Sequence, residues 1–158
     1  MISKLNEWML SIQVPREELG GLPICPYARQ AIAQKLYDIR YTNVCDVHAV
    51  LSTVDIQRYA VTLIVVEDYL SYDENYLVNY TTTLNDEYKS KDFVILENDP
   101  RSPMIVNGVT TSFEDGYLWV VQSLNDLNQK SLELRKTDYY SYWTQQQLDD
   151  VVTWRIKQ

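Results

Sequence analysis

Apolar residues along the chain change between helical and strand spacing, which predicts a mixture of helices and strands. Residues 2–12 carry apolar side chains at helical spacing, whereas residues 37–44 alternate between apolar and polar, as in a half-buried strand. Residues 59–66 are almost continuously apolar and β-branched, as expected of a central strand covered on both faces. In chain order the pattern predicts helix 2–12, helix 25–36, strand 37–44, a short helix at 47–54, strand 59–66, helix 74–89, strand 93–96, a hairpin at 104–111, helix 116–134 and a C-terminal helix after Thr144.

Local signals support several of these boundaries. Asp73 can accept a backbone hydrogen bond as the N-cap of helix 74–89, and Thr144 with Gln147 resembles a capping box. Asn107-Gly108 between β-favouring residues predicts a tight hairpin, with an open loop as the alternative. Helices between strands require crossover connections and hence some parallel pairing. We therefore expect an α+β fold, a single domain over residues 1–158, in which helices pack on a small mixed β-sheet.

Charge and aromatic content narrow the classes of partner. The formal net charge of −8 disfavours nonspecific binding to nucleic acid or to an anionic membrane surface and is compatible with a basic protein partner. Two cysteines, no apolar leader after Met1 and no apolar run of 18 residues predict a cytoplasmic protein that does not enter a membrane. Because 13 tyrosines and 4 tryptophans outnumber 2 phenylalanines, many aromatic side chains have a polar end suited to half-buried or interface positions. The densest cluster, 139–143, suits either an interface or core packing.

Cys25 is the residue whose setting most suggests chemistry. With Pro26 as the first helical residue, Cys25 becomes the N-cap, where free backbone N–H groups and the helix dipole favour a thiolate. Arg29, about one turn away, adds to this effect, so we expect a lowered pKa and a reactive thiol. The alternative is that Cys25 packs as a small hydrophobic residue while Ile24 and Tyr27 fix the entry to the helix.

Arg40 is the second candidate catalytic residue. Strand alternation directs it to the face opposite Ile39 and Tyr41. If the strand returns toward the start of the Cys25 helix, the guanidinium and the thiol together define an anion-binding pocket, with Arg29 and Tyr27 as ligand-binding neighbours. Otherwise Arg40 is a solvated side chain or pairs with Glu67 or Asp68.

Three predicted strands end in acidic or thiol residues, namely Cys45-Asp46, Glu67-Asp68, and Glu97 with Asp99. If these strands are parallel neighbours, their carboxyl ends share the sheet edge where α/β proteins place ligands, so Glu67, Asp68 and Asp99 are candidate ligand-binding residues. Such a cluster could also hold a hard divalent ion through oxygen ligands. The alternative is that polar residues end the strands at the surface. Cys45-x-x-His48 has the spacing of a zinc pair, but Cys25 would bring the set to only three ligands. No glycine-rich nucleotide loop occurs, and we expect neither a metal nor a cofactor.

Two families resemble parts of the chain. Cys25-Pro26-Tyr27 before a helix is similar to the Cys-Pro-Tyr-Cys of glutaredoxins, with Ala28 in place of the second cysteine, which implies at most a monothiol site. A longer resemblance is to an uncharacterised bacterial family marked by an early Trp, Gly-Leu-x-x-Cys-Pro-Phe-Ala, and Ile-Arg-Tyr opening a strand. The matching residues, in the same order, are Trp8, Gly21-Leu22, Cys25-Pro26-Tyr27-Ala28, Ile39-Arg40-Tyr41, the strand 61–66 and Tyr72-Asp73. The second half departs, with Glu67-Asp68 and Asp99-Pro100 where that family carries His-Pro.

Two hypotheses for function follow. The first is a thiol-bearing site at Cys25 that binds or acts on a small anionic ligand; whether the chain is an enzyme stays open, because the resemblance implies no particular activity. The second is a non-enzymatic protein, of a size and composition that would suit a phage accessory protein, which binds a basic protein through an acidic, Tyr-rich surface.

Overall fold

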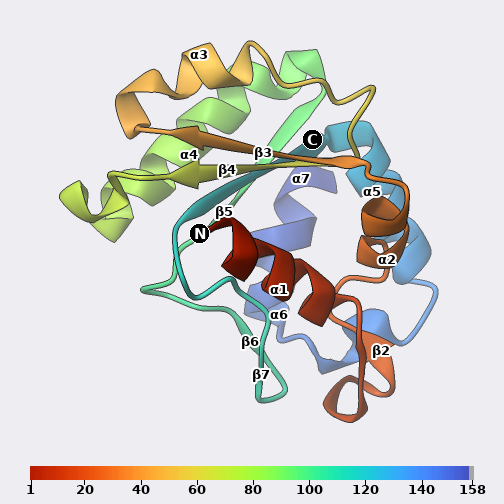
Figure 1. The fold of residues 1–158 in the computed structure, drawn as a ribbon. Coiled ribbons are helices and arrows are strands. Elements are labelled where there is room, and N and C mark those ends of the chain that lie inside the picture. Colours follow the sequence, from red (N-terminus) through yellow and green to blue (C-terminus); the bar gives the residue numbers. More distant parts are fainter. Residues whose placement is uncertain (157–158) are drawn as a thin grey trace.

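A mixed four-stranded sheet forms the centre of the computed structural model, which describes residues 1–156 (Figure 1). Its order is β3 (Tyr37–Thr42), β4 (Val61–Val66), β8 (Leu118–Ser123) and β5 (Phe93–Asn98). β3 and β4 are parallel, whereas β8 runs antiparallel to both of its neighbours. The strands β3, β4 and β5 therefore point in the same direction, and the predicted α+β fold with a small mixed sheet is confirmed.

The strand β4 is buried on both faces, as its apolar sequence predicts. Leu63 and Val65 pack with α1 (Ile2–Ile12) in one apolar cluster, and Ile64 and Val66 pack in a second cluster on the opposite face. Adjacent residues of a strand point to opposite faces, so a continuous apolar run can serve two cores at once.

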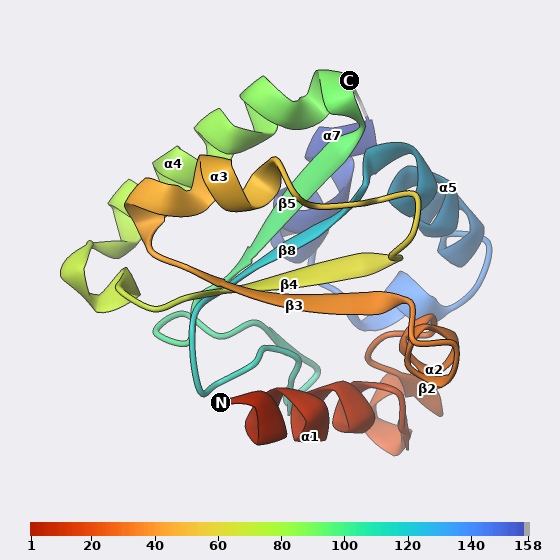
Figure 2. The same ribbon diagram turned by 45° about the horizontal axis from the view of Figure 1, so that its top comes forward.

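Helices cover both faces of the sheet (Figure 2). One face carries α3 (Val47–Leu51) and α4 (Glu74–Tyr88), and the other carries α1. The helices α2 (Ala28–Ala33) and α5 (Leu124–Leu134) lie at the end of the sheet where β3 begins and β8 ends. Asp73 caps α4 as predicted, because its carboxylate accepts a 2.7 Å hydrogen bond from the backbone N–H of Tyr76.

Smaller elements complete the chain. The short hairpins are β1 (Pro15–Arg16) with β2 (Leu22–Pro23), and β6 (Ile105–Val106) with β7 (Val109–Thr110). The C-terminal helical segment contains α6 (Gln145–Leu148), a π-helical turn (Asp149–Thr153) and α7 (Trp154–Ile156). Single 3-10 turns lie at Glu17–Leu19, Val44–Asp46, Tyr69–Ser71, Lys89–Lys91 and Tyr139–Tyr142. Both the Asn-Gly hairpin and the Thr144 capping box form as predicted.

The predicted helix over 116–134 is wrong in its first half. Residues 118–123 form β8, and the helix begins only at Leu124, with Ser123 as its N-cap. The apolar run 117–121 fits either a buried helix or a buried strand, and the decision comes from tertiary pairing, because β8 bonds to β4 and β5 on its two sides.

The edge strand β5 is covered by a side chain of α4. The amide of Asn85 accepts from the N–H of Ile95 at 2.8 Å and donates to the carbonyl of Ile95 at 2.7 Å, as a neighbouring strand would. An edge strand otherwise presents unpaired backbone groups to other chains. Asn85 thus closes the sheet at this position and ties α4 to it.

We expect Asn85→Ala to lower the free energy of unfolding by about 2 kcal/mol, because it leaves a backbone donor and a backbone acceptor without partners. Asn79→Ala is the matched control on an exposed position of the same helix and should change stability by less than about 0.5 kcal/mol. Urea unfolding followed by circular dichroism measures both. Because alanine favours a helix more than asparagine does, a loss can come only from lost contacts, and an Asn85→Ala variant as stable as Asn79→Ala would show that the bonds to Ile95 contribute nothing.

Candidate functional site

A cavity of about 360 Å³ lies between α1, α2 and the sheet face that bears Leu63. Its walls are mainly apolar, and its volume falls within the range of small-molecule sites. Trp8 and Met9 come from α1, Ile32 from α2, and Val61 and Val120 from the sheet. The β1–β2 and β6–β7 hairpins add further apolar side chains, including Leu22 and Val106.

Polar groups gather at the end of the cavity near Cys25. Tyr139 donates a hydrogen bond to the carbonyl of Ile24, and burial raises the pKa of its phenol far above the ordinary range, so this hydroxyl stays neutral. The ammonium of Lys130 lies 4.9 Å from the ring centroid of Tyr27 and 2.7 Å from the carboxylate of Asp126. Among the wall residues, Lys130 is the one that carries a charge.

The structure places Cys25 outside the helix, so its predicted role as N-cap is wrong. Helix α2 begins at Ala28, and Tyr27 is its N-cap residue with αR backbone angles. The N–H of Cys25 instead bonds to the carbonyl of Ile12 at 2.9 Å, which fixes the residue at the end of α1. Cys25 is half-buried and forms part of the cavity wall.

The predicted lowering of the Cys25 pKa is also wrong. Burial raises the pKa of the thiol above its ordinary value, and this effect outweighs the backbone N–H groups of Tyr27 and Ala28 and the charge of Lys130, which favour the thiolate. The sequence correctly suggests N–H groups around the sulfur, but the apolar wall that removes water from it is assembled from distant segments.

Arg40 lies on the other face of the sheet from Cys25. It is in register with Ile64, whose side chain faces α3 and α4, whereas Cys25 shares its cavity with Leu63. The guanidinium pairs with Asp38, with 2.6 Å between Nε and Oδ2, and not with Glu67, Asp68 or the thiol. The expected pocket between Cys25 and Arg40 therefore does not form. Of the other predicted neighbours, Tyr27 lines the cavity and Arg29 is exposed on α2 outside its wall.

The carboxyl ends of β3, β4 and β5 share one edge, but their carboxylates bind different partners. Asp68 accepts from the N–H of Val44 at 2.9 Å, Glu67 is exposed, and Asp99 pairs with Arg101. The strand β8 lies between β4 and β5, which separates Asp99 from Glu67. Within residues 1–156, no three His, Cys, Asp or Glu side chains are grouped so that they could hold a metal ion.

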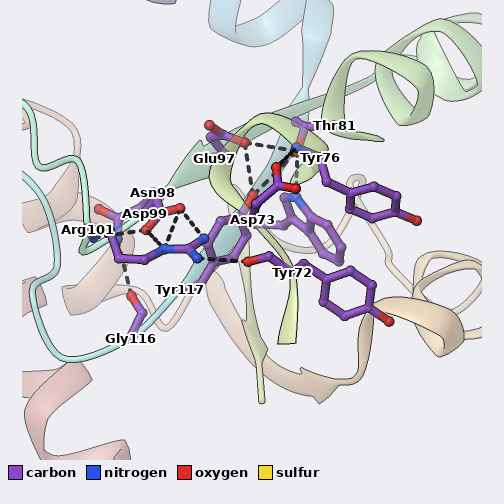
Figure 3. A network of polar contacts seen from close by, with 11 residues as sticks. Tyr72, Asp73, Tyr76, Thr81, Glu97, Asn98, Asp99, Arg101, Gly116 and Tyr117 are labelled. Atoms are coloured by element: carbon purple, nitrogen blue, oxygen red, sulfur yellow. Dashed lines mark hydrogen bonds and ion pairs between the residues drawn. The ribbon is translucent and has the colours of Figure 1, made fainter. Parts of the chain in front are cut away.

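Sequence reasoning missed the partner of Asp99. The guanidinium of Arg101 bonds to both carboxylate oxygens of Asp99, the shortest distance being 2.6 Å, and its Nη1 donates to the carbonyl of Tyr72 at 2.9 Å (Figure 3). Asp99 is buried, and the pair ties the loop after β5 to the start of α4. Spacing of two residues in a loop gives no signal for such a contact.

A second group of hydrogen bonds surrounds Glu97, beside the Arg101 pair (Figure 3). Its carboxylate accepts from the hydroxyls of Tyr117 at 2.9 Å and Thr81 at 3.2 Å, and the indole of Trp119 donates to Thr81 at 2.9 Å. Burial raises the pKa of Glu97 above its ordinary value of 4.5, although the two hydroxyls act in the opposite direction. These contacts join α4, β5 and β8.

Comparison with protein-family models, with curated proteins and with solved structures gives no match to this chain. The resemblance to a bacterial family through the Cys25 and Arg40 motifs therefore stays a prediction. In the part of the chain that the structure describes, no helix is both long enough and apolar enough to cross a membrane.

We expect Cys25 to react more slowly with iodoacetamide than the exposed Cys45, and its rate to rise beyond about pH 9, because burial disfavours the thiolate. The single-cysteine variants Cys45→Ser and Cys25→Ser allow each thiol to be followed separately by mass spectrometry. A Cys25 rate that levels off near neutral pH would contradict the raised pKa.

We expect Glu97→Gln to stabilise the protein at neutral pH and to have little effect at about pH 3.5. The raised pKa of Glu97 means that its contribution to stability is favourable below the unfolded value of 4.5 and is lost as the pH rises through the folded value. A glutamine can still accept from Tyr117 and Thr81 without carrying charge. The measurement is urea unfolding at both pH values, with the exposed Glu114→Gln as control; a variant less stable than wild type at pH 7 would show that the carboxylate's own hydrogen bonds dominate.

Proposed function

We propose that the chain binds a small, mainly apolar molecule with one anionic group in the cavity between α1, α2 and the sheet. The observation that carries the proposal is the cavity itself, whose walls are mainly apolar, with Lys130 as the charged wall residue and Gln30, Thr111 and Gln122 as uncharged polar ones. Apolar walls supply affinity through burial of ligand surface, and a few polar groups fix orientation.

Lys130 supports an anionic group on the ligand. Its ammonium is half-buried, with a side chain 23% exposed, and it already lies between the Tyr27 ring and Asp126. A carboxylate or sulfonate at this end would add a second anion to a lysine that has further donors free. Nearby Tyr139 and Cys25 would contribute a phenol and a neutral thiol.

The proposal is binding rather than thiol chemistry. A nucleophilic cysteine needs its thiolate, and burial works against the thiolate of Cys25. A cytoplasmic location belongs to the same proposal, because the two cysteines are free and a reducing compartment suits them.

We expect Ala31→Phe to weaken binding of the apolar anion anilinonaphthalene sulfonate at least tenfold, because Ala31 lines the cavity and a phenyl group would fill it. Ala33→Phe is the matched control, since Ala33 lies exposed on the same helix outside the wall. Fluorescence titration measures both, with circular dichroism to verify folding. Equal binding by the two variants would place the probe elsewhere and overturn the proposal.

The preference of the cavity for one head group over another tests the proposal that the ligand carries an anionic group. Octanoate, octanol and octylamine share one chain length, and displacement of the probe should be strongest for octanoate. Lys130→Met keeps the length of the side chain and should reduce the advantage of octanoate over octanol by about fivefold, the effect of one partly exposed ion pair. Cys25→Ser should leave displacement within about twofold. If octanol competes as well as octanoate in the wild type, the ligand needs no anionic group.

A further inference from the structure

The negative charge of the chain is concentrated in one region. Residues 41–88, which contain α3, β4 and α4, hold eight acidic residues and one basic residue, Arg58, and so carry −7 of the formal net charge of −8. Seven of these eight acidic residues are exposed, and Asp68 is half-buried. The other 110 residues of the chain are therefore close to neutral, and the negative charge belongs to α4 and to the caps and loops beside α3, β4 and α4 (Figure 2 shows these elements).

A row of stacked tyrosines runs along the side of α4 in this layer. The rings of Tyr72 and Tyr76 stack with centroids 5.1 Å apart, and Tyr76 and Tyr80 stack at 6.0 Å. In Figure 3 the rings of Tyr72 and Tyr76 lie side by side and point away from the network around Glu97 and Arg101. We call Tyr72, Tyr76 and Tyr80 the tyrosine row. Tyr80 is anchored against Trp119, and Tyr76 at the centre is 46% exposed.

Carboxylates lie beside the tyrosine row: Asp73, whose carboxylate accepts from the backbone N–H of Tyr76 at 2.7 Å, directly follows Tyr72, and Glu87 lies about two turns after Tyr80 on α4. Burial raises the pKa of the Tyr72 and Tyr80 hydroxyls, and the nearby charges of Asp68 and Glu87 respectively raise them further. Glu87 also lies 3.8 Å from His48 of α3, so the row faces the side of α4 toward α3. Leu77 and Leu84 of α4 are buried in the core. Tyr72 and Tyr80 pack partly against that core, and Tyr76 between them is the exposed member of the row.

We propose that the tyrosine row and its flanking carboxylates form a docking surface for an arginine-bearing basic polypeptide segment. Guanidinium groups stack on aromatic faces and bind carboxylates in two-point geometry, and this surface offers both side by side. The negative charge of this surface favours a basic segment over other occupants, because a second copy of this layer, an anionic membrane and a nucleic acid would each bring negative charge to it. The surface lies on the other side of the sheet from the cavity, so it is independent of ligand binding there.

Hexa-arginine and hexa-lysine peptides test the proposal, because they have equal charge and only guanidinium groups stack well on tyrosine rings. We expect the fluorescently labelled hexa-arginine peptide to bind more tightly, in a manner weakened by salt. Tyr76→Ala should weaken hexa-arginine binding about threefold or more and remove the preference over hexa-lysine, whereas Tyr76→Phe should retain it. Glu87→Gln should weaken the binding of both peptides.

Matched controls separate this surface from diffuse attraction to an acidic protein. Tyr142→Ala removes a tyrosine that is 40% exposed in a distant segment, and Glu114→Gln removes an exposed charge outside residues 41–88. Both should change binding less than twofold in fluorescence anisotropy. The proposal is overturned if Glu114→Gln acts as strongly as Glu87→Gln, if Tyr76→Ala leaves the arginine preference intact, if neither peptide binds, or if sedimentation shows that the surface joins two copies of the chain.

Discussion

The burial of β4 on both of its faces is the constraint on which the rest of the molecule depends. The side chains of its consecutive residues Leu63 and Ile64 point to opposite faces and pack in different apolar clusters. The strand therefore separates two layers of the molecule that have different chemistry. Parallel pairing with β3 and antiparallel pairing with β8 fix the register on both sides. A slip of one residue would exchange the two sets of side chains and expose each to the wrong layer. The cavity and the acidic layer are thus positioned by the same six residues.

At the β5 edge of the sheet, the side-chain amides of two asparagines form paired hydrogen bonds with backbone groups. Asn85 pairs with both polar groups of Ile95, and Asn98 pairs in the same manner with Phe113, at 2.8 Å for each of its two bonds. The Asn85 amide supplies the partners that the edge strand β5 lacks, whereas the Asn98 amide, on β5 itself, ties the strand to the backbone of the loop at Phe113. The Asp99–Arg101 pair then fixes the backbone at Tyr72, just before the N-cap of α4. The first tyrosine of the row therefore has a rigid base, which lowers the conformational entropy lost on binding a partner.

Most elements follow from local pattern, whereas the site depends on packing between distant segments. The run 61–66, the Asp73 cap and the Asn107-Gly108 turn are each specified by neighbouring residues, and each forms as predicted. The region 117–123 misleads because its apolar run suits a helix as well as a strand, and only pairing with β4 and β5 selects the strand.

The candidate site shows the same division between local and distant information. Lys130 pairs with Asp126 at a spacing of four residues on α5, which from sequence resembles an ordinary surface ion pair. Its place on the cavity wall arises because α5 packs beside α2 at the end of the sheet.

The distribution of charge bears on the anionic ligand that we propose, because a chain of net charge −8 should repel an anion overall. Residues 41–88 carry −7 of that charge, but none of their acidic side chains is among the described wall residues of the cavity, where Lys130 is the charged group. The uneven distribution of charge therefore supports both proposals, an anionic ligand in the cavity and a basic segment on the tyrosine row.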